Sequence, residues 1–144
     1  MLLSAVVPAA DELEAVLDAN RSFYDAFEAR DLDAMSQLWE HSDRATCTHP
    51  GWPTLRGWAR VAASFFALFQ NDQRLQFILT EVHVQADGDV AWVSLDENVL
   101  DVDAGLAVAA MNLFTRGGDD QWRMVAHHAS VITAPATLGE EEHG

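Results

Sequence analysis

Hydrophobic residues recur at helical spacing in the first half of the chain. Asp11 can cap a helix whose apolar stripe runs as far as Phe27, and Asp31 can cap a second helix. A third helix is expected from Gly57 to Gln70. The expected buried side of the first two helices consists of Leu13, Val16, Leu17, Asn20, Tyr24, Phe27, Leu32, Met35, Leu38 and Trp39. The first half therefore predicts three helices.

The second half alternates with the period of a β-strand. Four long strands are expected at residues 74–86, 90–101, 105–116 and 121–133, after a short strand at 44–49. The connections between the long strands are short and rich in Gly and Asp, so neighbouring strands must run antiparallel. Three helices then have to cover one face of a single curved sheet. The predicted fold class is α+β.

Length and composition predict one domain with a substantial core. The chain has 144 residues, of which 49% are hydrophobic, and it contains no internal repeat or linker. Residues 1–10 are interpreted as an arm that is either loose or packed on a partner subunit. The folded domain is expected over residues 11–133, and residues 134–144 are expected to form a flexible acidic tail.

The charge of the chain restricts its partners. Eight arginines and no lysines stand against 23 acidic residues, giving a formal net charge of −15. Such a field repels phosphate backbones and anionic lipid headgroups, so nucleic-acid and membrane roles are disfavoured. The first ten residues lack a basic region and are too short to span a bilayer. The single cysteine, Cys47, excludes an internal disulfide and favours the cytoplasm.

The strand at 90–101 presents two sets of side chains to opposite sides of the sheet. One set, polar with one aromatic residue, is expected to face a pocket. The other, mostly apolar, is expected at a subunit interface. The first set is Trp92, Ser94, Asp96 and Asn98, and the second is Val93, Leu95, Glu97 and Val99. A bulge or a slip of one residue would exchange the two sides.

Asp96 and His128 are the candidate catalytic residues. Apolar surroundings disfavour the charged carboxylate of Asp96, so its pKa is expected to move towards a useful range for a general base. His128 can exchange protons near neutral pH and is the candidate partner or acid. The alternative is that Asp96 lies near an open rim and His128 is a structural histidine.

The pocket is expected to be lined mainly by aromatic side chains. The candidate ligand-binding residues are Tyr24, His49, Trp52, Trp58 and Trp92. The alternative for Tyr24, which its helical stripe favours, is a core residue with its hydroxyl at the surface, and His49 could equally brace its loop. A Cys47–His49 nucleophile has nothing to orient the histidine. His127 and His128 point to opposite strand faces, and no ligand-spacing motif is present, so neither a metal nor a cofactor is expected.

Several short segments resemble one known superfamily when they are taken in order. They are residues 31–35 (DLDAM), 46–50 (TCTHP), 55–57 (LRG), 91–93 (AWV) and 122–130 (WRMVAHHAS). Together they span residues 31–130, which is most of the range 11–133. The chain thereby resembles the nuclear transport factor 2-like superfamily, and within it SnoaL-like domains and the association domain of calcium/calmodulin-dependent protein kinase II.

That resemblance implies a cone-shaped half-barrel, with three N-terminal helices packed on a curved, mainly antiparallel sheet and a pocket between them. It also implies homodimers formed through the outer sheet face. The function expected is binding of a small apolar or aromatic molecule, with isomerisation, dehydration or cyclisation by proton transfer as the chemistry. The alternative is a non-catalytic association module.

The chain departs from the resembled proteins at three positions. Ser94 and Leu113 are aligned with the two pocket arginines of the kinase association domain. Ala126 replaces the first histidine of the final-strand motif, whereas His128 and Ser130 remain. These differences argue against binding of the same ligand as the kinase association domain, but they do not argue against assembly of subunits.

Overall fold

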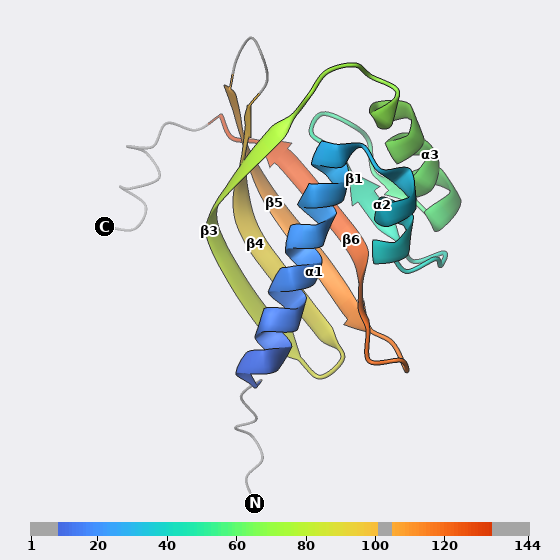
Figure 1. Ribbon diagram of the computed structural model, residues 1–144, viewed down its shortest axis with the longest axis vertical. Coiled ribbons are helices and arrows are strands. Elements are labelled where there is room, and N and C mark those ends of the chain that lie inside the picture. The colour runs from blue at the N-terminus through green and yellow to red at the C-terminus, as the bar shows by residue number, and fades with distance from the viewer. Residues whose placement is uncertain (1–8, 101–104, 134–144) are drawn as a thin grey trace, which may run out of the picture.

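The computed structural model describes residues 9–100 and 105–133, which form three helices and one sheet (Figure 1). The elements are α1 (Ala10–Ala29), α2 (Leu32–Leu38), β1 (Thr46–Thr48), β2 (Leu55–Arg56), α3 (Trp58–Phe69), β3 (Gln76–Asp87), β4 (Val90–Leu100), β5 (Gly105–Arg116) and β6 (Trp122–Val131). The expected α+β class is confirmed. Nearly all of the expected N-terminal arm and the whole acidic tail lie outside the described residues.

The sheet has the strand order β2-β1-β6-β5-β4-β3. The four long strands form the expected antiparallel meander, whereas β1 runs parallel to β6. The short strand β2 pairs with β1 and was not predicted. Because β1 joins the far side of β6, the loop that follows β1 lies near the end of the sheet where α3 packs (Figure 1).

The two predicted helix caps have different outcomes. Asp31 caps α2 as expected, since its side chain accepts a hydrogen bond from the backbone N–H of Ala34 at 3.0 Å. The prediction for Asp11 was wrong, because α1 begins one residue earlier, at Ala10, and Ala9 occupies the cap position without a side-chain bond. Asp11 lies in the first turn instead, where a negative charge interacts favourably with the helix dipole.

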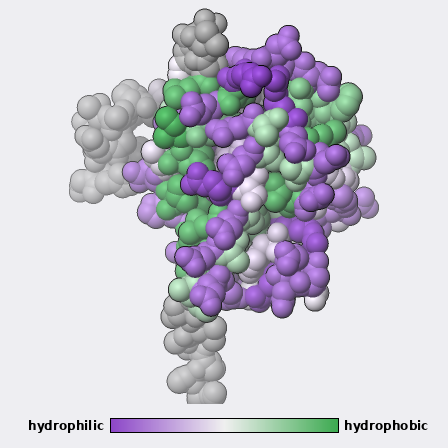
Figure 2. All heavy atoms as spheres, in the orientation of Figure 1, coloured by the Kyte–Doolittle hydropathy of each residue, from purple (hydrophilic) through white to green (hydrophobic). Residues whose placement is uncertain are grey.

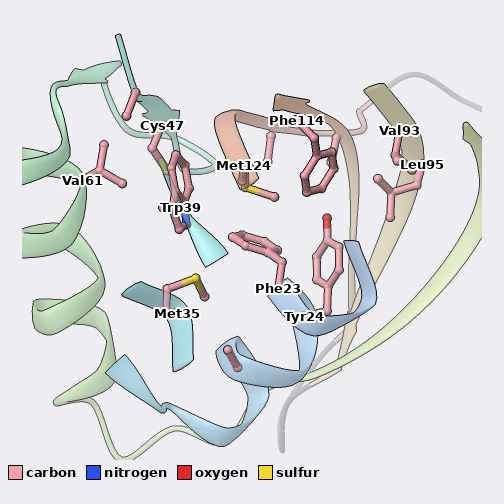
Figure 3. Close-up of a cluster of buried hydrophobic side chains, with 14 of the residues drawn as sticks. Phe23, Tyr24, Met35, Trp39, Cys47, Val61, Val93, Leu95, Phe114 and Met124 are labelled. Carbon is pink, nitrogen blue, oxygen red and sulfur yellow. The ribbon is translucent and has the colours of Figure 1, made fainter. Parts of the chain in front are cut away.

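The core lies between α1 and the inner face of the sheet. Phe23 and Tyr24 project from α1 into this space, with their rings edge to face and the centroids 4.9 Å apart (Figure 3). Trp39, predicted as the end of the buried stripe, is 1% exposed. Burial of these large side chains supplies much of the hydrophobic free energy that holds the helices on the sheet.

The orientation of β4 is the reverse of the one expected. Val93, Leu95 and Glu97 face the core and are buried, whereas Asp96 is half-buried on the outer face. The physical reason is that the mostly apolar set of side chains fills the space beneath α1. The expected assignment of that set to a subunit interface was therefore wrong.

A bulge in β6 decides which histidine points inward. The pairing of β5 with β6 shifts between Leu113 and Phe114, so both Met124 and Val125 are buried. After this shift His127 faces the core and His128 is exposed.

Figure 2 shows the side of the molecule that carries α1. Hydrophilic side chains dominate over α1, and apolar residues show between this helix and the nearer edge of the sheet. No helix among the described residues is long and apolar enough to cross a membrane.

Candidate functional site

A cavity of about 290 Å³ opens between α1, α3, the loop after β1 and the inner face of the sheet. Its apolar lining comes from Phe27, Pro50, Trp52, Leu68, Leu75, Phe77, Val99, Leu106 and Val108. Its polar lining comes from His49, Gln73, Glu97 and His127. A mainly apolar hollow with a few convergent polar groups is typical of a site for a small molecule.

Glu97 lies at the buried end of this cavity. Its side chain is on β4 and is only 3% exposed, and Tyr24 Oη donates a hydrogen bond to its Oε2 at 2.5 Å. Burial raises the pKa of Glu97 to about 7, against the lowering effect of the hydrogen bond from Tyr24. The same burial, together with the nearby carboxylate, raises the pKa of Tyr24, so that its hydroxyl stays protonated and remains a donor.

Asn112 continues the hydrogen-bond network from Tyr24 across the core. It is fully buried on β5, and its Nδ2 donates to Tyr24 Oη at 3.1 Å and to Asn20 Oδ1 at 2.8 Å. Its Oδ1 lies 2.5 Å from Nδ1 of His127. Because an amide oxygen can only accept, Nδ1 of His127 must carry the proton.

The protonation of Nδ1 leaves Nε2 of His127 as an acceptor. Burial, with smaller contributions from His49 and His128, lowers the pKa of His127 to about 3, so the ring is neutral at pH 7. A neutral imidazole with its proton on Nδ1 has a bare Nε2. His127 lines the cavity, and no other described residue bonds to this nitrogen.

His49 lines the cavity and packs edge to face against Trp52, with the ring centroids 5.0 Å apart. Its Nε2 lies 2.9 Å from Oγ of Ser64, and Ser64 donates its own proton to the Val61 carbonyl. Nε2 of His49 therefore carries a proton and donates it to Ser64. Burial lowers the pKa of His49 to about 4, so this ring is neutral as well.

Cys47 is fully buried behind His49, with Sγ 3.6 Å from Nε2. Burial, and next the charge of Glu97, raise the pKa of the thiol to about 12. A thiol that stays protonated is a poor nucleophile, so this arrangement does not support a Cys–His nucleophile.

The cavity offers no cation to a ligand. No arginine is among the described residues that line it, and the sequence has no lysine. Among the described residues, no group of three or more His, Cys, Asp or Glu side chains is arranged to hold a metal ion.

Three of the candidate ligand-binding residues lie at or next to the cavity. His49 and Trp52 line it, and Trp52 is 39% exposed. Tyr24 is a core residue behind Glu97, and its hydroxyl reaches that carboxylate instead of the surface. The structure thus brings together part of the expected aromatic wall.

The other two candidate ligand-binding residues and both candidate catalytic residues lie elsewhere. Trp58 stacks on His41, with centroids 4.5 Å apart, outside the cavity lining. Trp92 and Asp96 are on the outer face of β4, and His128 is exposed on the outer face of β6. The expected placement of Asp96 and His128 in the pocket was wrong, because the apolar phase of β4 and the bulge in β6 turn both of them outward.

The positions aligned with the pocket arginines of the kinase association domain also face outward. Ser94 pairs with Met111 and Leu113 pairs with Trp92, all on the outer face. That alignment therefore does not identify pocket positions of this chain.

Glu97 and His127 are the site residues that the sequence reasoning missed. Glu97 is the one carboxylate on the otherwise apolar face of β4, a pattern that indicates a buried charge and so a candidate for a functional residue. His127 carried no comparable signal, since its orientation depends on the bulge in β6.

Comparison with known proteins gives matches over most of the chain. A solved structure from Streptomyces avermitilis, a candidate dehydratase of the NTF2-like family, is 38% identical with a TM-score of 0.80, over 86% of this chain and 98% of that one. A candidate calcium/calmodulin-dependent protein kinase type II association domain from Thiobacillus denitrificans is 36% identical with a TM-score of 0.71, over 90% of this chain and all of that one.

A curated relative from a plant shares the same region. The F-box protein SKIP8 of Arabidopsis thaliana is 31% identical over 119 residues, which are 82% of this chain and 50% of that protein. The chain therefore spans about half the length of this relative. The family model of the SnoaL-like domain matches residues 16–135, from the first helix to beyond the last strand. With its helix-covered sheet and its inward-facing cavity, the chain belongs to the family of SnoaL-like domains.

Proposed function

We propose that this protein binds a small, mainly apolar molecule in the cavity and that Glu97 exchanges a proton with it. The observation that carries the proposal is the carboxyl group of Glu97, which is buried at the end of an apolar cavity with one oxygen held by Tyr24. Its pKa of about 7 is close to the operating pH, which is the condition under which a general acid–base group works best.

The arrangement suits proton transfer at carbon. Tyr24 holds Oε2 of Glu97, so Oε1 is the oxygen available to a ligand. The ionised carboxylate takes a proton from a carbon of the ligand, and the protonated carboxyl returns it at a second position. The result is an isomerisation. In a dehydration, the protonated carboxyl instead gives its proton to the departing hydroxyl group. The similarity to the candidate dehydratase supports this class of reaction.

The test is deuterium incorporation from D₂O, followed by proton NMR. The probes are three mainly apolar ketones with exchangeable protons beside the carbonyl, namely cyclohexanone, indanone and tetralone. Each ketone is used with and without an amino substituent, so that neutral and cationic ligands are both tested. We expect the protein to accelerate exchange of the protons beside the carbonyl for at least one probe. Glu97→Gln should reduce that rate about a hundredfold or more, since general acid–base catalysis contributes at least this much.

Two variants make the test specific. Glu14→Gln changes the same functional group at an exposed position of α1 and should leave the rate unchanged. Asp96→Asn tests the acid–base role predicted for Asp96 from the sequence. The proposal fails if no probe binds or exchanges, or if Asp96→Asn and not Glu97→Gln removes the activity.

We also propose that the chain forms a homodimer through the outer face of the sheet. Ile78 and Met111 are large apolar residues on that face and are 48% and 46% exposed. Met111→Glu should reduce the mass measured by light scattering from dimer to monomer. Phe66→Glu, at an apolar residue of α3 that is 56% exposed, is the control and should leave the mass unchanged.

The same measurement separates the two functions in part, since a dimer is compatible with either of them. A ring of many subunits would support the alternative function, which is that of an association module. The similarity to the candidate kinase association domain is the observation that favours this alternative. A monomeric wild-type protein would contradict the proposed dimer.

A further inference from the structure

We propose that the ligand of this cavity carries a protonated amine on an apolar body, and that the amine binds at Glu97. This inference rests on the binding part of the proposed function and names the chemistry of its ligand. Oε1 of Glu97 holds the amine or takes a proton from carbon, but does not do both at once. It follows from the direction of the hydrogen bonds around the cavity, from the absence of cationic side chains in the described lining and from the charge of the chain.

When Glu97 is ionised, the polar groups at the buried end of the cavity are acceptors. An ionised carboxylate can only accept hydrogen bonds, and Oε1 of Glu97 has no partner among the described residues. Nε2 of His127 is also an acceptor, because Nδ1 of the same ring gives its proton to Asn112. A ligand must therefore bring donors to this end.

The hydrogen-bond donors near this end of the cavity are directed away from the cavity. The hydroxyl proton of Tyr24 is directed to Glu97, and the Nε2 proton of His49 is directed to Ser64. Among the described lining residues, Trp52 and Gln73 also carry donor groups, but both residues are exposed and not at the buried end. A ligand group that is anionic or that can only accept hydrogen bonds would therefore find no donor at the buried end of the cavity.

A cation satisfies this end better than a neutral donor. Glu97 is a buried carboxylate that accepts a single hydrogen bond within the described residues, so its charge is poorly compensated. Phe27, Trp52 and Phe77 line the cavity with aromatic rings, which attract an ammonium group through their faces. The net charge of −15 also concentrates cations at the protein surface and repels anions.

The experiment compares three probes of similar size and different charge. Phenethylamine, phenethyl alcohol and phenylacetate are titrated separately into the wild-type protein, and binding is read from protein-observed NMR. A pH of about 8 keeps both Glu97 and the amine in their charged forms. Phenethylamine should bind at least about tenfold more tightly than phenethyl alcohol, a difference of about 1.4 kcal/mol. Phenylacetate should bind more weakly than either.

Glu97→Gln tests where the amine binds. The variant keeps the shape of the side chain and removes its charge, so the preference for the amine should disappear while the alcohol still binds. Glu14→Gln makes the same change on the exposed side of α1 and should preserve the preference. The comparison of the three probes uses the wild-type chain alone, so it decides the proposal even if the Glu97 variant does not fold.

The outcomes separate this inference from the function on which it rests. If phenethyl alcohol or phenylacetate binds as tightly as phenethylamine, the binding function stands and the amine assignment is overturned. Retention of the amine preference in Glu97→Gln overturns it as well. If none of the three probes changes the resonances of cavity residues such as Trp52 and His127, both proposals fall.

Discussion

Tyr24 Oη lies 2.5 Å from Glu97 Oε2, and this hydrogen bond joins α1 to β4 across 73 positions of the sequence. The helix thereby holds one oxygen of a carboxyl group that the sheet alone would leave buried without a donor. The position of the candidate acid–base group depends on the packing of α1 against the sheet. Fold and candidate chemistry are coupled through this one contact.

The buried carboxyl of Glu97 predicts a pH dependence of stability. Burial raises its pKa from 4.5 to about 7, so between these values the folded protein holds a proton that the unfolded chain has lost. Its contribution to stability is present below about pH 4.5 and is lost as the pH rises through about 7. Relative to Glu97→Gln, the wild-type free energy of unfolding should fall by about 3 kcal/mol between pH 4 and pH 8.

Urea denaturation of both proteins at the two pH values measures this difference. The depressed pKa values of His49 and His127 act in the opposite direction, since they make the folded state less stable as the pH falls. Both histidines are present in wild type and variant, so their effect cancels in the comparison. A difference that stays constant with pH would show that Glu97 titrates alike in both states.

Removal of the Tyr24 hydroxyl should raise the pKa of Glu97 above about 7. The hydrogen bond from Tyr24 favours the charged carboxylate and lowers this pKa, so Tyr24→Phe removes that effect and leaves the burial in place. Carbon-detected NMR titration of the Glu97 side chain measures the change. Ser64→Ala is the control, because it removes a buried hydroxyl that bonds to His49 and not to Glu97. An unchanged or lower pKa in Tyr24→Phe would contradict the role given to this contact.

The sequence predicted the fold well because its main signals are local. The helical stripe from Leu13 to Phe27 and the turns rich in Gly and Asp depend on neighbouring residues only, and they placed α1 and the meander correctly. The two-residue strand β2 carries too short a pattern to be recognised. Asp11 was misplaced because helix ends are poorly specified by single residues.

The site was harder to predict because it depends on which face of each strand is buried. Alternation in β4 defines two sets of residues but does not say which one faces inward, and the apolar set with Glu97 proved to be the inner one. The bulge that turns His127 inward has no signature in the sequence of β6. By contrast, two of the residues expected in the pocket, His49 and Trp52, do line the cavity, and a role in ligand binding stays a prediction for both.

Asn112 should be a strongly stabilising residue despite its polarity. It is fully buried and bonded to Asn20, Tyr24 and His127. Asn112→Leu therefore leaves Asn20 Oδ1 and His127 Nδ1 without their partner, and it removes the bond that Tyr24 Oη accepts, while the bond from Tyr24 to Glu97 remains. Each unsatisfied group costs about 1–3 kcal/mol, which predicts a total loss of about 3 kcal/mol or more in urea denaturation.

Asn98→Leu is the matched control for this change on the neighbouring strand. Asn98 bonds to the Ile78 carbonyl and to Thr80 on the outer face, where water can replace the lost bonds. Its replacement should cost about 1 kcal/mol or less. Equal losses in the two variants would show that the buried network adds nothing beyond ordinary surface hydrogen bonds.

Cys47 should be unreactive in the folded protein. Its side chain is fully buried, and burial raises the pKa of the thiol to about 12, so the nucleophilic thiolate is scarce and out of reach of reagents. Iodoacetamide should modify it at least about a hundredfold more slowly in the native state than in urea, as followed by mass spectrometry. The control is Ser22→Cys in a chain with Cys47→Ala, because position 22 is exposed on α1, away from the outer face of the sheet, and should react in the native state. Rapid native modification of Cys47 would instead restore the Cys47–His49 pair as a candidate nucleophile.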